Sequence, residues 1–253
     1  MEKTIIAVSN QKGGVGKSTI AVALAQYLAT KFRVLFIDMD PQGSATGIFV
    51  DRSSNALFDA LMGQLAPIQA VTDTLAQYPA SLKIMTSSPR LSELDAMLAG
   101  KIDKFHCVQD LMTSDLEYEF VVIDCPGSTG ILTLASMVAA DFVLIPTSCE
   151  PMSFVQIDDM LDLISAVQKR LNPLLVRLPL AVTLFDSRNR LDQEILAELQ
   201  SKYVAVFPTV VRRRVRIKEE FAARIPCTNE DLRNLSNEVY ERIIHEQNKI
   251  RTK

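Results

Sequence analysis

The chain has 253 residues and a formal net charge of −3, with 48% hydrophobic and 23% charged residues. This composition is typical of a globular domain and excludes collagen-like and largely disordered chains. The longest segment without a charged residue, 125–140, contains a proline and two glycines and is shorter than the roughly 20 apolar residues of a membrane-spanning helix. We therefore expect a single domain over residues 1–253 and no transmembrane segment.

The start of the chain and its cysteines indicate the compartment. Residues 1–4 run directly into an apolar stretch and lack the basic start and cleavage site of a signal peptide, so we expect a cytoplasmic protein. The cysteines include no C-x-x-C pair, which argues against a zinc site or a disulfide framework. We expect reduced, mostly buried thiols at Cys107, Cys125, Cys149 and Cys227.

Short apolar runs rich in β-branched residues alternate with amphipathic stretches along the chain. The runs are typical of strands buried on both faces, and stretches such as 18–30 and 154–171 are typical of helices. The predicted fold class is α/β, with a doubly wound, mostly parallel sheet flanked by helices. Residues 52–104 are the least regular part, where we expect helices and one strand. The predicted strands are Ile5–Val8, Val34–Ile37, Leu82–Met85, Phe120–Ile123, Phe142–Ile145, Leu180–Phe185 and Val204–Phe207.

A glycine-rich segment, residues 9–19, joins the first predicted strand to the first predicted helix. Glycines allow successive N–H groups to point at anionic oxygens, and the helix N-terminus adds its partial positive charge. In such a loop Lys17 reaches the β- and γ-phosphates of a nucleotide, and the Ser18 hydroxyl ligates Mg²⁺. A purely structural turn would explain the glycines but not a Gly-Lys-Ser-Thr sequence that enters a helix.

The loop carries a second lysine, Lys12, and Gln11 stands where the common phosphate-loop pattern has its first glycine. A lysine at this position can point away from its own nucleotide and neutralise phosphates bound by a second subunit. The segment resembles the K-G-G-x-x-G-K-[ST] motif of the ParA/MinD family, P-loop NTPases of the deviant Walker A type. The resemblance implies an ATP-sandwich dimer in which Lys12 contacts the partner's nucleotide. The implied ATP-binding residues are Lys12, Gly13, Gly14, Val15, Gly16, Lys17, Ser18 and Thr19.

Three further segments resemble this family. Residues 38–42 match its D-x-D-P-Q form, and residues 120–124 resemble a Walker B strand that ends in Asp124. The family often has a proline where this chain has Gly127, so the rigidity of the following loop differs. Glu150, in a Cys-Glu-Pro segment, is expected on the dimer face, and a merely structural role is the alternative.

The resemblance also implies roles for the carboxylates, which would lie at strand ends where ligands of doubly wound sheets bind. Asp40 would orient or deprotonate the attacking water, while Lys12 and Lys17 stabilise transition-state charge. Without a phosphate loop, the same carboxylates would be read as caps of the next turn. The implied Mg²⁺ residues are Ser18, Asp38 and Asp124.

The C-terminal part of the chain is basic. Residues 201–253 carry 12 Lys and Arg against 7 Asp and Glu, whereas residues 1–200 carry 15 against 23. Clustered cations neutralise DNA phosphates without reading sequence. Arg213 matches a family segment that helps to hold the nucleotide base, although its neighbours depart from that segment. The candidate DNA contacts, with solvated surface charge as the alternative for each, are Arg212, Arg214, Arg216, Lys218 and Arg233.

The family contains branches that partition DNA, position division sites at membranes or transfer electrons through an iron–sulfur cluster. The residues around Cys125 do not match the iron–sulfur branch, and residues 236–253 suggest a helix that packs on the domain rather than one that enters a membrane. Residues 38–42 have the partition-type form. A MinD-like membrane-associated ATPase and a cargo-positioning ATPase remain the alternatives.

We therefore expect a ParA-type ATPase for plasmid or chromosome partition, with ATP and Mg²⁺ as cofactors and no membrane partner. The family resemblance implies a weak intrinsic ATPase that forms a homodimer with ATP and then binds double-stranded DNA non-specifically on the nucleoid. It also implies a ParB-type centromere-binding partner that stimulates hydrolysis and so releases the ATPase from DNA.

Overall fold

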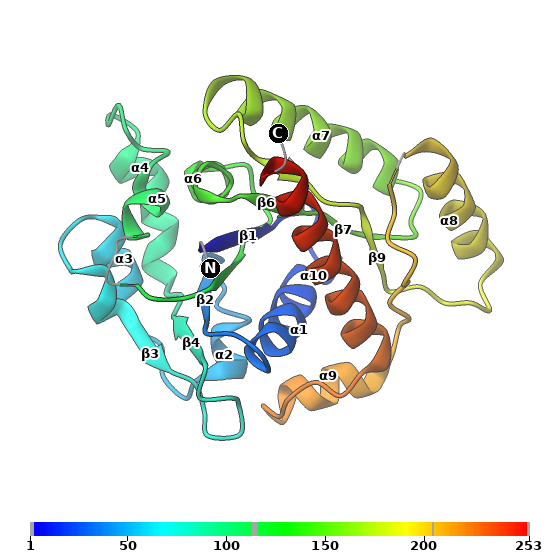
Figure 1. Cartoon of the computed structure of the whole chain (residues 1–253), viewed down its shortest axis with the longest axis horizontal. Coiled ribbons are helices and arrows are strands. Elements are labelled where there is room, and N and C mark those ends of the chain that lie inside the picture. Colours follow the sequence, from blue (N-terminus) through cyan, green and yellow to red (C-terminus); the bar gives the residue numbers. More distant parts are fainter. Residues whose placement is uncertain (1–2, 113–115, 204, 252–253) are drawn as a thin grey trace.

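The computed structural model describes residues 3–112, 116–203 and 205–251 (Figure 1). The strands are β1 (Thr4–Val8), β2 (Val34–Asp38), β3 (Val71–Asp73), β4 (Leu82–Met85), β5 (Phe120–Asp124), β6 (Phe142–Leu144), β7 (Pro146–Ser148), β8 (Val176–Arg177) and β9 (Ala181–Thr183). The helices are α1 (Lys17–Ala29), α2 (Thr46–Phe49), α3 (Ala56–Leu61), α4 (Leu94–Leu98), α5 (Cys107–Leu111), α6 (Ile131–Ala139), α7 (Ser153–Arg170), α8 (Arg190–Lys202), α9 (Val215–Ala222) and α10 (Glu230–Arg251). Two 3₁₀ turns cover Pro67–Ala70 and Pro89–Glu93.

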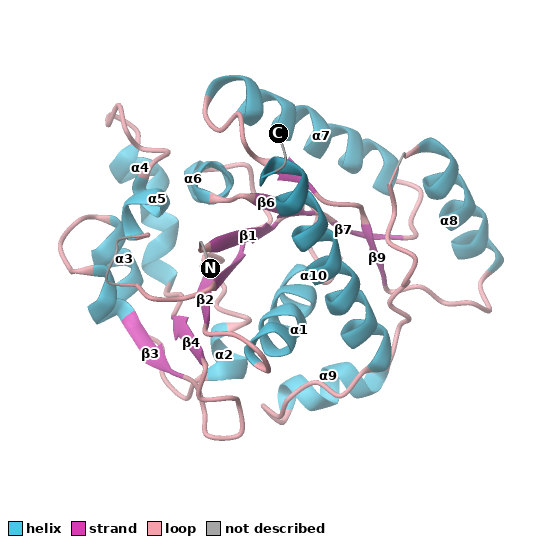
Figure 2. Cartoon of the chain, in the orientation of Figure 1, coloured by secondary structure: helices cyan, strands magenta, loops and turns pink. Residues whose placement is uncertain are grey.

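A seven-stranded sheet with the order β3-β4-β2-β5-β1-β6-β8 crosses the molecule (Figure 2). Its strands pair in parallel, apart from β3, which is antiparallel to β4 at one edge. All residues of β1, β2 and β5 are buried, as expected for central strands covered on both faces. The structure confirms the predicted α/β fold with a mostly parallel sheet.

Helices cover both faces of this sheet because alternate strand residues point to opposite sides. Ile6 and Val8 of β1 join a core with α1, α2, α9 and α10, whereas Ile5 and Ala7 join a core with α3 to α8. Helix α1 lies between the sheet and α10, so most of its residues are buried and its sequence is apolar on nearly every side. Figure 1 shows α10 lying beside α1.

Some predicted strands differ in the structure. The run 142–145 ends as β6 at Leu144, and the chain then forms β7, which pairs with β9 in a separate two-stranded sheet. Residues 180–185 form only β9, because Leu184 takes a φ of 56° and turns the chain. In the predicted strand 204–207, residue 204 lies outside the described residues, and Val206 forms only an isolated bridge with Leu180.

Residues 52–104 contain two strands where one was predicted. Strand β4 coincides with the prediction, and β3 adds an antiparallel edge strand of three residues, Val71–Asp73, whose side chains are mostly exposed. A strand of this length carries too little hydrophobic alternation to be recognised from sequence. The four cysteines are free, and Cys107, Cys125 and Cys149 are buried, as predicted.

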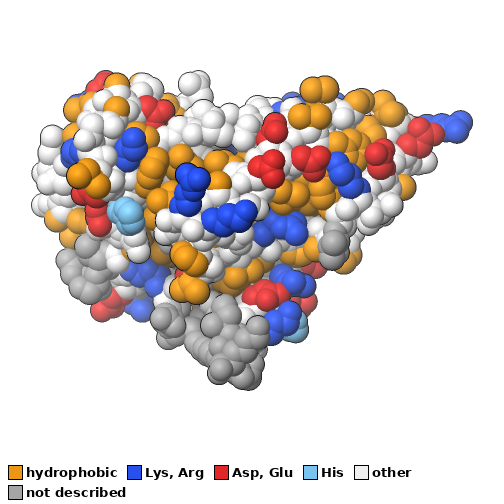
Figure 3. Space-filling model, turned by 90° about the horizontal axis from the view of Figure 1, so that it is seen from above, with side chains coloured by type: hydrophobic (Ala, Val, Ile, Leu, Met, Phe, Trp, Pro, Cys, Tyr) orange, Lys and Arg blue, Asp and Glu red, His pale blue; other side chains and the backbone are white. Residues whose placement is uncertain are grey.

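The surface shows mixed character. In the view of Figure 3, basic, acidic and hydrophobic side chains are interspersed over the visible face. Across the described ranges, we find no helix with the length and apolar character needed to cross a membrane. Residues 236–251 lie within α10, whose apolar side chains Leu235, Val239 and Ile243 are buried in the core that contains α1. The prediction of a packed C-terminal helix is therefore confirmed.

Candidate nucleotide-binding site

The loop between β1 and α1, residues 9–16, follows the carboxyl end of a central strand. Gly14 and Gly16 have φ angles of 78° and 83°, in the left-handed region that favours glycine. A Cβ atom added at Gly13 or Gly14 would meet nothing within 4 Å, so the space beside the loop is open. Backbone thus borders open space at the N-terminus of α1, which is the arrangement that binds anions.

Two polar side chains anchor this loop to the small β7-β9 sheet. The Asn10 amide donates to the Pro146 carbonyl at 2.6 Å, and its Oδ1 accepts from the Lys12 N–H at 3.0 Å. The Thr183 hydroxyl, on β9, donates to the Val15 carbonyl at 2.7 Å. Sequence analysis did not identify either residue as part of the site. Thr183 is a polar residue inside the predicted apolar run 180–185, and that interruption was the available signal for it.

Lys17 begins α1 with a largely buried side chain. Its Nζ donates to the Lys12 carbonyl at 2.9 Å, and only 7% of the residue is exposed. Burial lowers the pKa of Lys17, while the carboxylates of Asp124 and Asp40 act in the opposite direction. An anion bound in the loop would further stabilise the charged ammonium. Lys17 therefore has the position and surroundings expected of a phosphate-binding lysine.

Two fully buried carboxylates end neighbouring strands. Asp38 of β2 and Asp124 of β5 are paired in register across the sheet. The Oδ2 atom of Asp38 accepts from the backbone N–H of Thr46 at 2.7 Å and from its hydroxyl at 2.8 Å. Burial raises the pKa of Asp38 to about 6, against these hydrogen bonds from Thr46. Sequence analysis missed Thr46, because nothing eight residues after Asp38 marks it as a partner.

Asp124 lacks such support. Neither of its carboxylate oxygens has a hydrogen-bond partner within the described residues, and none of the side chain is exposed. Burial raises the pKa of Asp124 well above its ordinary value, and the carboxylate of Asp38 adds to this rise. The Lys17 ammonium opposes it, as does the Ser18 hydroxyl, which is near the carboxylate but does not reach it with hydrogen-bond geometry. A buried carboxylate without partners is costly, and a bound cation would relieve that cost.

These residues fit Mg²⁺. The ion usually takes one or two carboxylates together with substrate phosphates and water, rather than a cage of protein ligands. The described part of the chain contains no group of three or more His, Cys, Asp or Glu that could hold a metal alone. Asp124, with Asp38 beside it and the Ser18 hydroxyl nearby, is the donor set that a nucleotide-bound Mg²⁺ would complete.

Asp40 lies two residues beyond β2 and is partly exposed. Its backbone N–H donates to Asp38 Oδ1 at 3.2 Å, and its own Oδ1 accepts from the Gln42 N–H at 3.0 Å. Its charge raises the pKa of Lys17, so the carboxylate lies within electrostatic range of the lysine that begins α1. This position is compatible with a role toward a water at the terminal phosphate.

Lys12 and Glu150 meet within one chain. The Lys12 ammonium forms an ion pair with Glu150 Oε2, and this contact lowers the pKa of Glu150. The side chains are 18% and 50% exposed, so the pair lies at the surface beside the phosphate loop. The two residues expected on a dimer face are thus neighbours in the single chain.

Gly127 lies against the phosphate loop. A Cβ atom at this position would be 3.5 Å from Lys17 Nζ and 3.6 Å from the Gln11 carbonyl. Any side chain here would therefore touch the lysine that is expected to hold phosphate. The departure from the family's proline keeps this approach to Lys17 free.

The C-terminal arginines fall into two groups. Arg212 donates to Asp231 at the start of α10 through Nε at 2.8 Å and Nη2 at 2.5 Å. Arg216 pairs with the buried Glu220 on α9 at 2.9 Å. Both guanidinium groups already have carboxylate partners. Through its partner Asp231, Arg212 connects the segment before α9 to α10. Sequence analysis did not foresee Asp231, which is distant in sequence.

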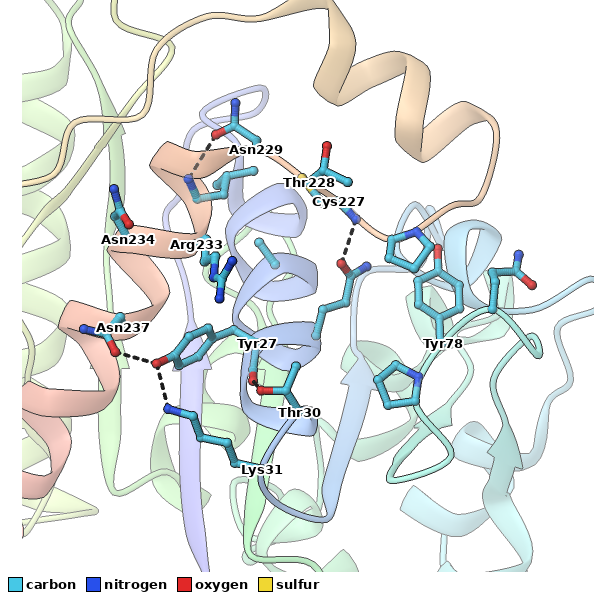
Figure 4. A pocket seen from close by; sticks show the side chains of 16 residues that line it. Tyr27, Thr30, Lys31, Tyr78, Cys227, Thr228, Asn229, Arg233, Asn234 and Asn237 are labelled. Atoms are coloured by element: carbon cyan, nitrogen blue, oxygen red, sulfur yellow. Dashed lines mark hydrogen bonds between the residues drawn. The ribbon is translucent and has the colours of Figure 1, made fainter.

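The remaining candidate cations lack such partners. Arg214, Lys218 and Arg233 are exposed and form no ion pair within the ranges that the structure covers. Arg233 lies on α10 and lines a cavity against α1 (Figure 4). The backbone N–H of Arg213 donates to the Phe185 carbonyl at 2.9 Å, which places its segment beside the end of β9.

Comparison with known proteins agrees with this geometry. Residues 3–176 match the family model of an AAA domain. The chain is 35% identical over 221 residues to the chromosome partitioning protein ParA of Myxococcus xanthus, covering 85% of this chain and 77% of the relative. It is 32% identical over 243 residues to the sporulation initiation inhibitor protein Soj of Bacillus subtilis, covering 93% and 94%.

A solved structure adds a nucleotide-bound example of the fold. The cobyrinic acid a,c-diamide synthase of Mycobacterium smegmatis, with a bound ATP analogue and magnesium, superposes with a TM-score of 0.80. It is 29% identical to this chain, and the superposition covers 93% of each. That protein holds the nucleotide and the metal on a fold that this chain shares.

Proposed function

We propose that this chain, which belongs to the ParA/MinD family of P-loop ATPases, is a ParA-type ATPase that partitions plasmid or chromosomal DNA. The observation that carries its nucleotide chemistry is the orphaned carboxylate of Asp124 beside Asp38, next to an open glycine loop. The curated relatives named ParA and Soj favour partition over the other activities of this fold. Residues 1–253 would act as one ATPase domain.

The residues of the loop would hold ATP and its magnesium. Lys17 and the backbone N–H groups of residues 13–19 would bind the phosphates, while Ser18, Asp38 and Asp124 would hold the ion. Mg²⁺ would supply positive charge that offsets the charge developing on the phosphoryl oxygens. Asp40 would orient the attacking water or accept its proton, which gives slow intrinsic turnover.

Dimer formation would require Lys12 to exchange partners. In the single chain its ammonium contacts Glu150, so the lysine is held beside the loop instead of extended away from it. In an ATP-bound dimer it would leave Glu150 and contact the phosphates held by the second subunit. Glu150 would then face the partner subunit without its cation.

The unpaired cations support a DNA-binding surface. Arg214, Lys218 and Arg233 are exposed, and a dimer would double the number of phosphates they neutralise. Arg212 and Arg216 would act mainly by fixing the segment that presents the others. The dimer would then bind DNA non-specifically and associate with the nucleoid in the cytoplasm. A ParB-type partner would stimulate hydrolysis and release it.

A DNA-binding measurement tests this proposal. Fluorescence anisotropy of a random-sequence duplex should rise with ATP·Mg²⁺ but not with ADP·Mg²⁺ or without nucleotide, using Asp40→Ala to prevent turnover. The binding should weaken as salt rises. Lys17→Ala is the control, because it should bind neither nucleotide nor DNA. Absence of DNA binding in every state would refute the partition assignment and leave the ATPase with a different cargo.

A further inference from the structure

A chain of hydrogen bonds connects the segment that follows β4 to the turn that carries Asp40. Strands β2 and β4 are parallel neighbours in the sheet, with Ile37 opposite Met85, so the residues that follow them leave the same edge of the sheet side by side (Figure 1). Asp40 comes three residues after Ile37, and Ser87 comes two residues after Met85. The residues after β4 are therefore placed to contact the aspartate that is expected to act on water.

The turn at residues 40–43 is shaped by local hydrogen bonds. The Asp40 N–H donates to Asp38 Oδ1 at 3.2 Å, and the Gly43 N–H donates to the Asp40 carbonyl at 2.9 Å. Gly43 has a φ angle of 63°, in the left-handed region that favours glycine, which lets the chain close the turn. The Gln42 N–H donates to Asp40 Oδ1 at 3.0 Å. These partners all lie in the turn or at the end of β2, so they do not attach the turn to another strand.

Ser87 supplies that attachment. Its hydroxyl donates to the Asp40 carbonyl, 47 residues away in sequence, and its N–H donates to the Thr46 hydroxyl at 2.9 Å. The same Thr46 hydroxyl donates to Asp38 Oδ2 at 2.8 Å. Ser87 is only 1% exposed and Thr46 only 4%, so these hydrogen bonds are shielded from water and strengthened by their surroundings. Ser87 thus joins the end of β4 to both aspartates at the end of β2.

The turn also packs on these two residues. A Cβ atom added at Gly43 would lie 3.8 Å from the Cβ atoms of both Ser87 and Thr46, which is ordinary van der Waals contact. Alanine at position 87 would keep this Cβ contact and the N–H that binds Thr46. It would remove only the hydroxyl, and the Asp40 carbonyl would keep its hydrogen bond from Gly43. The contribution of the Ser87 hydroxyl can therefore be removed without disturbing the packing.

We infer that Ser87 is a positioning residue for ATP hydrolysis, which acts by holding the Asp40 turn against the end of β4. The inference rests on the proposed function, in which Asp40 orients the attacking water or accepts its proton. The position of such a group matters, because a displacement of about 1 Å can slow a reaction about 100-fold. Ser87 is buried and acts through the backbone of Asp40, by restricting the positions that the Asp40 carboxylate takes.

Amide hydrogen exchange of the nucleotide-free protein tests whether Ser87 holds the turn. In Ser87→Ala the amides of Gly43 and Thr46 should exchange about 2- to 12-fold faster than in the parent, which is the effect of losing one hydrogen bond. Ser81→Ala is the matched control, because the Ser81 hydroxyl also donates to a backbone carbonyl, that of Ala29, but at the opposite end of β4. The control should leave both amides unchanged.

Hydrolysis and nucleotide affinity then separate a positioning role from a general loss of structure. The rate constant for hydrolysis in a single turnover should fall about 10- to 100-fold in Ser87→Ala and stay at the parent's value in Ser81→Ala. The dissociation constant for ATP, measured by equilibrium dialysis, should stay within about twofold of the parent's, because Ser87 lies outside the phosphate loop. A general loss of structure would weaken ATP binding as well.

These measurements distinguish failure of the inference from failure of the proposed function. Unchanged exchange at Gly43 and Thr46 in Ser87→Ala would overturn the inference, and so would an unchanged hydrolysis rate or a loss of ATP affinity as large as the loss of rate. If the parent does not hydrolyse ATP, or if Asp40→Ala hydrolyses it as fast as the parent, the proposed mechanism fails instead. Faster exchange in Ser87→Ala would then assign Ser87 a structural role only.

Discussion

The ion pair between Lys12 and Glu150 should act as a latch that opposes dimer formation, and Glu150→Gln should release it. In the dimer each Lys12 must leave its own Glu150 to reach the other subunit's nucleotide. Because the pair lies at the surface, with side chains 18% and 50% exposed, it stabilises the single chain by about 0.2–1 kcal/mol. Two latches open in each dimer, so their removal should favour association by about 0.4–2 kcal/mol, or about 2- to 30-fold in the dimer dissociation constant.

Sedimentation velocity with ATP·Mg²⁺ measures this constant, in an Asp40→Ala background that prevents turnover. Glu194→Gln is the matched control, since it breaks an exposed ion pair with Arg190 on α8 and leaves the phosphate loop untouched. Lys12→Ala should abolish the gain, because the latch is useful only if Lys12 also binds across the interface. If Glu150→Gln leaves the dissociation constant unchanged or raises it, the latch is refuted. A raised constant would show that Glu150 itself stabilises the interface.

Four further predictions concern the site and the basic segment. Burial raises the pKa of Asp38 to about 6, so the nucleotide-free protein should lose up to about 3 kcal/mol of unfolding free energy as the pH rises from about 4 through 6. Urea unfolding at several pH values should show this loss of stability, and the loss should be smaller in Asp38→Asn. If the variant and the parent have the same dependence of stability on pH, Asp38 is not its source. Lys17→Ala should bind no ATP in equilibrium dialysis while keeping the parent's circular dichroism, and retained affinity would remove it from the phosphate site. Arg214→Ala with Lys218→Ala should lower the salt slope of DNA binding by about 4, because the dimer loses two cations from each subunit. Arg212→Ala should mainly lower the melting temperature through its lost contact with Asp231. If Arg212→Ala instead lowers the salt slope and the double variant lowers the melting temperature, Arg212 is the DNA contact and the other two residues are structural.

Local sequence patterns were enough to predict most of the fold and the centre of the candidate site. The central strands are short, fully buried apolar runs, and Gly-Lys-Ser-Thr at the start of a helix fixed the place of Lys17 and Ser18. The division of 142–148 into two strands was not predictable. The short segment Pro146–Ser148 has no apolar run of its own, and only tertiary pairing with β9 makes it a strand.

Partners distant in sequence account for the rest. Arg212 reads as a free cation in a basic segment, yet Asp231 lies beside it once α10 packs against α1. Glu150 and Lys12 are 138 residues apart and meet only in the folded chain. A run of basic residues in a sequence shows how many cations are present. It does not show which of them pair with carboxylates once the chain has folded.

The burial of Asp124 links the stability of this protein to its ligand. A core carboxylate with no hydrogen-bond partner departs from the rule that buried polar groups are paired, and such local departures tend to mark function. Asp38 shows the contrast, because Thr46 supplies it with two hydrogen bonds from the protein. Of these two carboxylates, only that of Asp124 is left to bind a group that does not belong to the protein. Since a cation would bind the folded chain and not the unfolded one, Mg²⁺ with nucleotide should raise the free energy of unfolding. The largest part of this gain should come from the contact with the Asp124 carboxylate.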